Sequence, residues 1–174
     1  PICGIVAVNR PLTVAVAEAL APVFTEVVIA PSYEPDALGL LAARKNLRVL
    51  EAPPPGRQAL HLRSIDGGLL VQTADSVTWD PPSFRVVTRR APTDAEWRDL
   101  ALAWRVAAAV TSNTIVVAKD GATWGIGAGQ QNRRDAGRIA AEKAAGRAVG
   151  GACASDAFFP FRDGLDAAAE AGCT

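Results

Sequence analysis

Several classes of protein are excluded by what this chain lacks. Its 174 residues include no methionine and a single histidine, His61, which stands between two leucines. There is neither an H-x-E motif nor a C-x-x-C motif, so a zinc deaminase site is excluded. We find no Ser-His-Asp group either, and we expect His61 to be a surface or edge-strand residue rather than a ligand.

Charge and hydropathy exclude further classes. The chain has 18 basic and 18 acidic residues and a formal net charge of zero, which removes the electrostatic argument for binding nucleic acid or an anionic membrane. No apolar run approaches the roughly 20 residues that span a bilayer. The first residues carry no signal-peptide pattern, so we expect a cytoplasmic protein. Because an initiator methionine is missing, we also expect a fragment or a processed product.

The cysteines are odd in number and far apart in the sequence. Cys3, Cys153 and Cys173 fit neither a disulfide framework nor the spacing of a zinc site. We therefore expect reduced, buried thiols and no metal.

The first fifty residues alternate between strand-like and helix-like segments. Short apolar runs at residues 4–8, 27–30 and 47–50 predict strands, and the run at 4–8 suits a strand buried on both faces of a parallel sheet. Helices are predicted between them, beginning at Pro11 and at Pro35. This alternation is typical of an α/β fold.

After a proline-rich break at residues 52–56 the pattern changes. We predict a hairpin from residues 60–65 and 68–72 and a short strand at 85–88. Thr93 and Glu96 form a capping box that opens a helix to about residue 110. Its predicted inward face consists of Trp97, Leu100, Trp104 and Ala108.

The last third of the chain predicts a strand, a tight turn and a returning strand over residues 114–126. A helix then follows to about residue 145. A strand at 148–154 and a helix at 163–171 complete the prediction.

Three glycines at alternate positions, Gly125, Gly127 and Gly129, stand between a predicted strand and a predicted helix that begins near Arg133 and Arg134. Glycine lets backbone amides approach a ligand, and a helix N-terminus favours anions, so this segment suits a phosphate. Alternatively, the glycines only allow strand and helix to pack closely. The segment lacks the full dinucleotide-binding pattern.

Two other segments carry polar groups that suit a ligand. Asn113 precedes a strand, where its amide could orient a carboxamide or formyl group or merely cap a turn. The segment Asp156-Ala-Phe-Phe-Pro-Phe-Arg-Asp163 combines three aromatic rings with carboxylates. It could stack a flat aromatic ligand, or it could plug the core while Asp163 caps the final helix.

Taken together and in this order, the three motifs resemble one known family. Ser112-Asn113, Gly125-x-Gly127-x-Gly129-Gln130 and the segment from Asp156 to Asp163 are similar to the formyltransferase part of the bifunctional purine-biosynthesis enzyme. In that enzyme this part is joined to inosine-monophosphate cyclohydrolase. The similarity extends over essentially the whole chain.

The resemblance implies a fold and an organisation. The fold would be a three-layer α/β/α sandwich of the cytidine-deaminase-like type, without zinc. Residues 1–58 would be the C-terminal part of a first subdomain, and residues 59–174 a second subdomain truncated at its C-terminus. The family works as a homodimer with active sites at the subunit interface.

The resemblance also implies a reaction and its residues. The family transfers a formyl group from 10-formyltetrahydrofolate to the 5-amino group of 5-aminoimidazole-4-carboxamide ribonucleotide (AICAR). Asn113 would be the catalytic residue that holds the carboxamide or the formyl group. The remaining contacts would be Arg133, Glu26 and Cys3 for the nucleotide, and Phe158, Asp163 and Arg134 for the folate.

This chain also departs from the family pattern. Glu26 and Cys3 replace the usual Asp and Gly, and Arg134 stands at a usually aliphatic position. The Lys-His pair that the family uses for proton transfer would precede residue 1, and we find no other base. The alternative function is therefore a non-catalytic nucleotide-binding or folate-binding module, or a dimerisation module.

Overall fold

The computed structural model describes residues 4–56, 59–75 and 77–174. The chain divides into two compact units, unit 1 up to Ala74 and unit 2 from Asp75 to Thr174. Each unit is described by itself. The predicted subdomain boundary at residue 58 stays a prediction.

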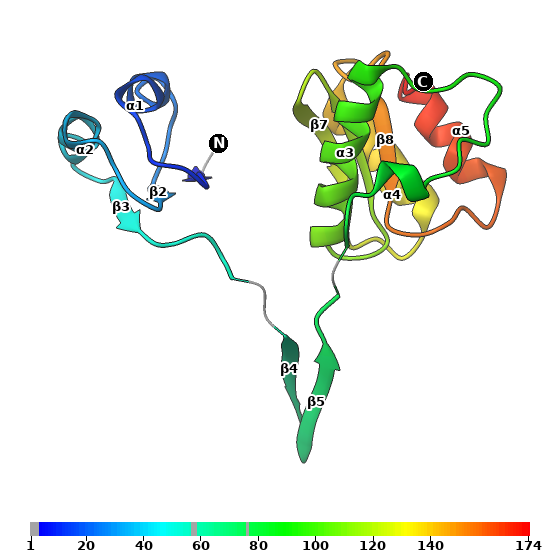
Figure 1. Cartoon of the computed structure of the whole chain (residues 1–174), viewed down its shortest axis with the longest axis horizontal. Coiled ribbons are helices and arrows are strands. Elements are labelled where there is room, and N and C mark those ends of the chain that lie inside the picture. Colours follow the sequence, from blue (N-terminus) through cyan, green and yellow to red (C-terminus); the bar gives the residue numbers. More distant parts are fainter. Residues whose placement is uncertain (1–3, 57–58, 76) are drawn as a thin grey trace. The chain divides into compact units, whose positions relative to one another are not determined.

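Unit 1 contains a small parallel sheet with two helices (Figure 1). Its strands are β1 (Ile5–Ala7), β2 (Val27–Ala30) and β3 (Arg48–Glu51), in the spatial order β1-β2-β3. The helices α1 (Val14–Leu20) and α2 (Pro35–Ala42) pack against each other. The core consists of apolar side chains from both helices, from β2 and from Leu12. The predicted alternation of strands and helices is confirmed.

Two details of unit 1 differ from the prediction. The first helix begins at Val14 and not at Pro11, because Leu12 forms a parallel bridge with Tyr33 before the helix starts. The strand β1 is not buried on both faces, since Ile5 is 66% exposed.

A two-stranded antiparallel hairpin follows, made of β4 (Leu60–Ile65) and β5 (Gly68–Thr73). Its turn uses Gly67 at φ 75°, a backbone conformation that glycine adopts without strain. Every residue of both strands is exposed, including His61, as predicted.

Unit 2 has three layers. Its sheet is antiparallel, with β6 (Ile115–Lys119) between β7 (Ala122–Gly127) and β8 (Ala152–Ser155). Successive residues of a strand face opposite sides of the sheet, so Ile115 and Val117 pack with α4 (Arg133–Ala144), while Val116 and Ala118 pack with α3 (Asp94–Ala109). The last helix, α5 (Arg162–Glu170), packs beside α4. The predicted α/β class is confirmed, and its cytidine-deaminase-like type stays a prediction.

The capping box of α3 is confirmed, but its predicted inward face is wrong in part, since Trp97, Leu100 and Trp104 are only half-buried. Glu96 N donates to Thr93 Oγ1, and the Glu96 carboxylate accepts from Thr93 N. Ala103 and Ala107 face the sheet. Because their side chains are small, the helix can approach the sheet closely. Ala108 is exposed. The tryptophans of α3 instead pack edge-to-face with Trp79.

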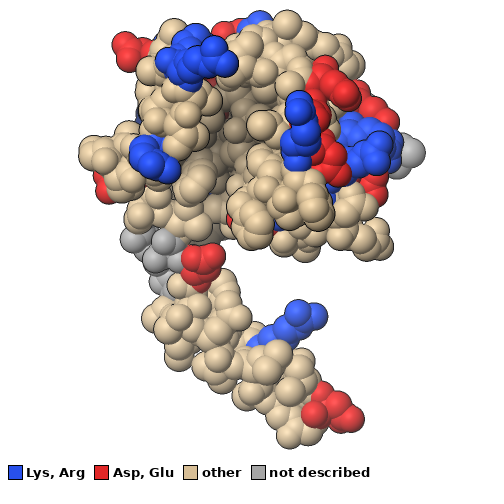
Figure 2. Space-filling model, turned by 90° about the vertical axis from the view of Figure 1, so that its right-hand side faces the viewer, with Lys and Arg blue, Asp and Glu red and all other residues tan. Residues whose placement is uncertain are grey.

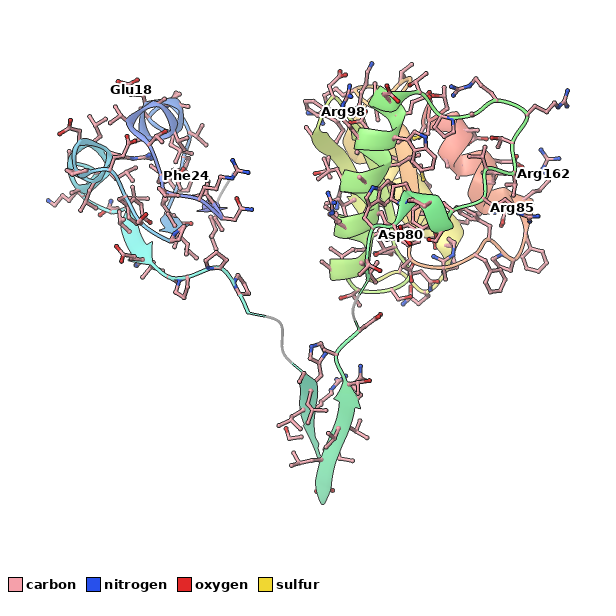
Figure 3. The ribbon with its side chains drawn as sticks, in the orientation of Figure 1. Glu18, Phe24, Asp80, Arg85, Arg98 and Arg162 are labelled. Carbon is pink, nitrogen blue, oxygen red and sulfur yellow. The ribbon has the colours of Figure 1, made fainter. Side chains whose placement is uncertain are left out.

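The predicted strand at residues 85–88 is also wrong. The segment contains a short 3-10 helix, η1 (Pro81–Ser83), after which Arg85 lies in irregular chain (Figure 3). Phe84 packs 5.3 Å, between ring centroids, from Trp104 of α3. This aromatic packing, and not strand pairing, holds the segment in place.

The cysteines are closer in space than in sequence. Cys153 and Cys173 pack against the same core cluster. The neighbouring Cys173 thiol and burial raise the pKa of the Cys153 thiol, which is therefore protonated at neutral pH. Cys3 lies outside the described residues.

Candidate functional site

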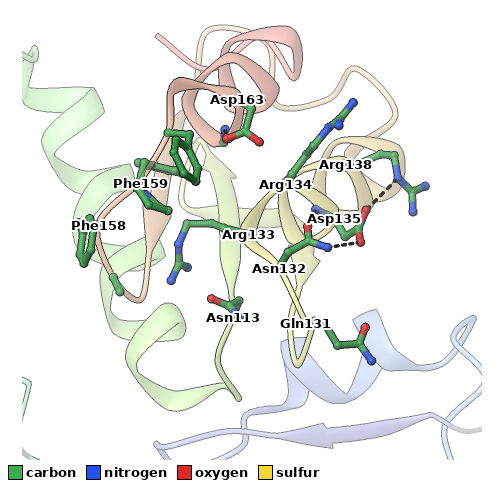
Figure 4. A pocket seen from close by; sticks show the side chains of 14 residues that line it. Asn113, Gln131, Asn132, Arg133, Arg134, Asp135, Arg138, Phe158, Phe159 and Asp163 are labelled. Atoms are coloured by element: carbon green, nitrogen blue, oxygen red, sulfur yellow. Dashed lines mark hydrogen bonds and ion pairs between the residues drawn. The ribbon is translucent and has the colours of Figure 1, made fainter.

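The predicted ligand contacts of unit 2 line a single pocket. It has a volume of about 700 Å³ and lies between Asn113, the N-terminal turn of α4, the loop after β8 and the start of α5 (Figure 4). Five residues proposed from the sequence lie in its wall: Asn113, Arg133, Arg134, Phe158 and Asp163. The structure thus brings together residues that are up to 50 positions apart in the sequence.

Two other predicted nucleotide contacts, Glu26 and Cys3, come before unit 2 in the sequence. Glu26 belongs to unit 1, where it lines a separate pocket of about 470 Å³ with Lys45 and Arg48. Cys3 lies outside the described residues. Their roles stay predictions.

Arg133 is the most tightly held cation of the pocket. Its side chain is 11% exposed, and its Nη1 donates to Asp156 Oδ1 at 2.6 Å and to Ser155 Oγ at 3.1 Å. Its Nε is buried and has no partner among the described residues. A guanidinium has five N–H donors, so Arg133 keeps donors beyond those that bind the protein.

Asp156 joins Arg133 to the segment that carries Asn113. Its Oδ2 accepts from Ser112 Oγ at 2.5 Å, and its Oδ1 accepts from Thr114 N at 2.7 Å. Burial favours the neutral acid, but the hydrogen bonds from Ser112, Thr114 and Arg133 outweigh it and hold the pKa of Asp156 below its ordinary value. Asp156 is therefore ionised at neutral pH.

Asn113 is oriented by the loop after β7. Its Nδ2 donates to the Gln130 carbonyl at 2.9 Å, and the backbones of the two residues exchange hydrogen bonds at 3.3 Å. Because a carbonyl only accepts, the amide must turn its nitrogen toward Gln130. The Oδ1 atom has no donor among the described residues and is left to accept from a ligand.

The glycines between β7 and α4 serve packing more than ligand binding. A Cβ atom at Gly125 would lie 1.9 Å from the Ala140 carbonyl oxygen, and one at Gly127 would lie 2.0 Å from that of Ala136. Gly129 has φ 68°, and its N–H donates to the Thr111 carbonyl at 2.8 Å. The packing interpretation holds for Gly125 and Gly127, which let β7 lie directly against α4.

The N-terminus of α4 is capped by its own side chains. Asn132 Oδ1 accepts from Asp135 N at 2.8 Å, and Asn132 Nδ2 donates to Asp135 Oδ2 at 2.7 Å. The Asp135 carboxylate also lies 3.9 Å from Arg138. A carboxylate in the first turn already benefits from the helix dipole, so the positive charge available to a ligand comes mainly from arginine side chains.

The rings of the aromatic segment are divided between the core and the pocket, and the stacking of a flat ligand stays a prediction. Phe159 packs against the core and closely approaches Gly164 of α5. Phe158 and Phe161 are 80% and 75% exposed, and both line the pocket. Asp163 does not cap the last helix, because Phe161 is the N-cap residue; Asp163 lies in the first turn, where its Oδ1 accepts from Gly164 N at 2.8 Å.

The site contains no recognisable metal centre. Within residues 4–56, 59–75 and 77–174, no group of three or more His, Cys, Asp and Glu side chains could hold a metal ion.

In the same residues no helix is long and apolar enough to cross a membrane. On the face shown in Figure 2, acidic and basic side chains are interspersed without a continuous patch of either sign.

Sequence reasoning missed several residues of the pocket, and it named Asp156 only as a carboxylate of the aromatic segment, without its supporting role. Gln131, Asn132, Asp135 and Arg138 line the pocket, and Asp156 organises its polar side. The sequence did contain a signal for two of these residues, Asn132 and Asp156. Asn132 directly precedes a helix and Asp156 directly follows a strand, two positions where polar side chains commonly serve a site.

Fold and pocket define an α/β protein whose site combines arginines, an amide and exposed aromatic rings. A family model described as "AICARFT/IMPCHase bienzyme" matches residues 3–143, and the chain belongs to this family. It is 51% identical to the bifunctional purine biosynthesis protein PurH of Bradyrhizobium diazoefficiens over 98% of the chain. It is 49% identical to the protein of the same name from Chloroflexus aurantiacus over 100% of the chain. In both comparisons the chain spans 35% of the relative's length.

Proposed function

We propose that this chain is a part of the formyltransferase half of its family and acts in purine biosynthesis by binding AICAR and 10-formyltetrahydrofolate. The observation that carries the proposal is the convergence of three separate motifs on one pocket. Asn113, Arg133 and Phe158 come from three segments, and each presents the chemistry that the ligands need. A small-molecule pocket of this size, with apolar walls and a few oriented polar groups, is typical of ligand sites.

The polar side of the pocket is the proposed nucleotide site. Arg133 supplies positive charge that is already oriented by Asp156. Asn113 presents Oδ1, an acceptor, because its Nδ2 is used by Gln130. This geometry favours a contact with the N–H groups of the AICAR carboxamide or amine over a contact with the formyl oxygen, which only accepts hydrogen bonds.

The aromatic side of the pocket is the proposed folate site. Phe158 offers an exposed ring face on which a pterin can stack. The Asp163 carboxylate can accept hydrogen bonds from the N–H edge of the pterin. Arg134 is exposed at the same pocket, where a positive charge suits an anionic ligand group rather than the aliphatic contact usual in the family.

Formyl transfer needs a base that removes a proton from a weakly nucleophilic aromatic amine. The described residues that line the pocket include arginines and aspartates but neither lysine nor histidine. We therefore propose that this chain supplies binding and that another segment or a second copy supplies the base. A cytoplasmic homodimer with shared active sites agrees with this division.

The second candidate is a non-catalytic nucleotide-binding or folate-binding module, or a dimerisation module. The convergence of the three motifs on one pocket favours it as well, since the described pocket residues supply contacts for a ligand but neither a lysine nor a histidine that could act as the base. Formyl transfer by this chain alone would contradict it.

Isothermal titration of the chain with AICAR and with a non-reactive folate analogue tests the proposal. We expect both ligands to bind, and Arg133→Ala to weaken AICAR far more than the analogue. Binding of neither ligand to the folded chain would contradict the assignment of the site.

A further inference from the structure

Asp156 is the centre of the polar side of the pocket, although it is not part of the pocket wall. Three donors from two other segments converge on its carboxylate: Ser112 Oγ, Thr114 N and Arg133 Nη1, at 2.5, 2.7 and 2.6 Å. Its side chain is 15% exposed. Asp156 borders a smaller neighbouring pocket of about 250 Å³, together with Ser112 and Ser155.

Two of these donors belong to the residues on either side of Asn113 in the sequence. Ser112 precedes it and Thr114 follows it, so a single carboxylate holds the chain on both sides of the amide. The Gln130 carbonyl then fixes the side chain of Asn113. Because both attachments act at once, the orientation of Asn113 depends on the position of Asp156.

The third donor, Arg133, carries the positive charge of the site, and its bond to Asp156 holds that charge in place. Asp156 accepts a hydrogen bond from Nη1 of Arg133 and thereby fixes the position of this end of the guanidinium. A charged pair with little exposure to water is held more strongly than a surface pair, and the loss of one partner leaves the other charge uncompensated. Arg133 is thus oriented before a ligand arrives.

From this arrangement we infer that Asp156 is a positioning residue of the nucleotide site, holding Asn113 and Arg133 in place together without touching the ligand. The inference rests on the proposed function for the identity of the ligand. The linkage between Asp156, Asn113 and Arg133 is a property of the ligand-free protein and can be measured without it.

The main test replaces the charge but keeps the shape. Asp156→Asn retains an acceptor for Thr114 N and loses the attraction to Arg133. We expect AICAR affinity to fall about ten-fold or more, because hydrogen bonds to charged groups are worth that much. Affinity for the folate analogue should change less than two-fold, as roughly expected for a ligand on the opposite side of the pocket.

A double-mutant cycle separates positioning from general weakening of the fold. In the Arg133→Ala background, Asp156→Asn should change AICAR affinity less than it does in the wild-type chain, because one of its two targets is gone and only the effect on Asn113 remains. Asp166→Asn is the matched control, since Asp166 also pairs with an arginine, Arg162, but on α5 outside the pocket wall. It should leave both affinities unchanged.

Amide hydrogen exchange in the ligand-free chain gives the second readout. Asn113 N and Gln130 N bond to each other's carbonyls and not to Asp156. Their exchange should accelerate in Asp156→Asn and not in Asp166→Asn. Unchanged exchange at both amides, or an equal loss of affinity with and without Arg133, would overturn the inference. A wild-type chain that fails to bind AICAR would contradict the proposed function instead, while the exchange rates still decide the role of Asp156.

Discussion

The two sides of the pocket are built differently. On the polar side, Asn113 and Arg133 are hydrogen-bonded to neighbouring segments and oriented by the protein itself. On the aromatic side, Phe158 and Phe161 are mostly exposed. An oriented side chain loses little freedom when a ligand binds, whereas an exposed ring gains most from being covered. We therefore expect the polar side to be oriented before a ligand binds and the aromatic side to become ordered when its ligand covers it.

The largest effect on stability is expected from a substitution that adds a side chain between β7 and α4. Gly127→Ala would place a Cβ 2.0 Å from the Ala136 carbonyl oxygen, so β7 and α4 must separate. We expect the free energy of unfolding of unit 2 to fall by about 3 kcal/mol. Urea denaturation followed by tryptophan fluorescence measures it, because all four tryptophans lie in unit 2.

Gly39→Ala is the control for this prediction. Gly39 lies in α2 of unit 1, and a Cβ there would meet nothing within 4 Å. The fluorescence transition of unit 2 should not move. A Gly127→Ala protein as stable as the wild type would contradict the close approach of β7 and α4.

The next effect compares two adjacent rings of the aromatic segment. Phe159→Ala should destabilise unit 2 by about 2 kcal/mol, because this ring packs against the core. Phe158→Ala should change stability by less than about 0.5 kcal/mol, since its ring is largely in water. It should instead weaken the folate analogue by about 1 kcal/mol, the worth of an aromatic contact. Calorimetric melting and titration with the folate analogue measure both effects. If Phe158→Ala destabilised unit 2 and Phe159→Ala weakened only the binding of the analogue, the roles assigned to the two rings would be wrong.

Removing the charge of the polar side should weaken ligand binding and also destabilise unit 2, because Arg133 pairs with the little-exposed carboxylate of Asp156. Arg133→Ala should weaken AICAR binding by about 2 kcal/mol, because it deletes an oriented charged donor. Arg162→Ala is a suitable control, since Arg162 is exposed and its partner, Asp166, lies on the same helix outside the pocket wall. Equal titration curves for the two variants would show that Arg133 does not contact the nucleotide.

The smallest expected effect is a pH dependence of stability. The pKa of Asp156 is lowered in the folded state, so its contribution is fully present above its unfolded pKa, near 3.8, and is lost as pH falls through the folded value. The melting temperature of unit 2 should therefore decrease as the pH is lowered below about 4. Asp156→Asn should show a shallower decrease over the same pH range. A decrease of the same steepness in wild type and variant would assign it to other carboxylates, such as Glu96, whose pKa is also lowered by Arg90.

Much of the fold followed from the sequence, for identifiable reasons. The capping box at Thr93 and the apolar run of β6 are local signals, and both elements formed where they were expected. The strand at residues 85–88 failed because the position of Phe84 depends on tryptophans of α3, a contact between distant segments. The inward face of α3 was wrong in part, because alanines, not the larger rings, allow close approach to the sheet.

The site was predictable in its members but not in its organisation. The motifs identified Asn113, Arg133 and Phe158, and the pocket brings them together. They could not reveal that Gly125 and Gly127 serve packing, since a glycine needed for a close contact and one needed for a ligand look alike in sequence. Nor could they reveal Asp156 as the group that joins the polar side, because its three donors come from two other segments that lie far from it in the sequence.

The assignment of the nucleotide to the polar side and of the folate to the aromatic side is tested by amide chemical-shift mapping of the labelled chain with each ligand in turn. We predict that AICAR shifts the resonances of Asn113, Gln130 and Arg133, and that the folate analogue shifts those of residues 157–163. Two distinct sets around one pocket would match the two sides described. If neither ligand shifts them, or if both shift only residues near Glu26, the pocket of unit 2 is not the site.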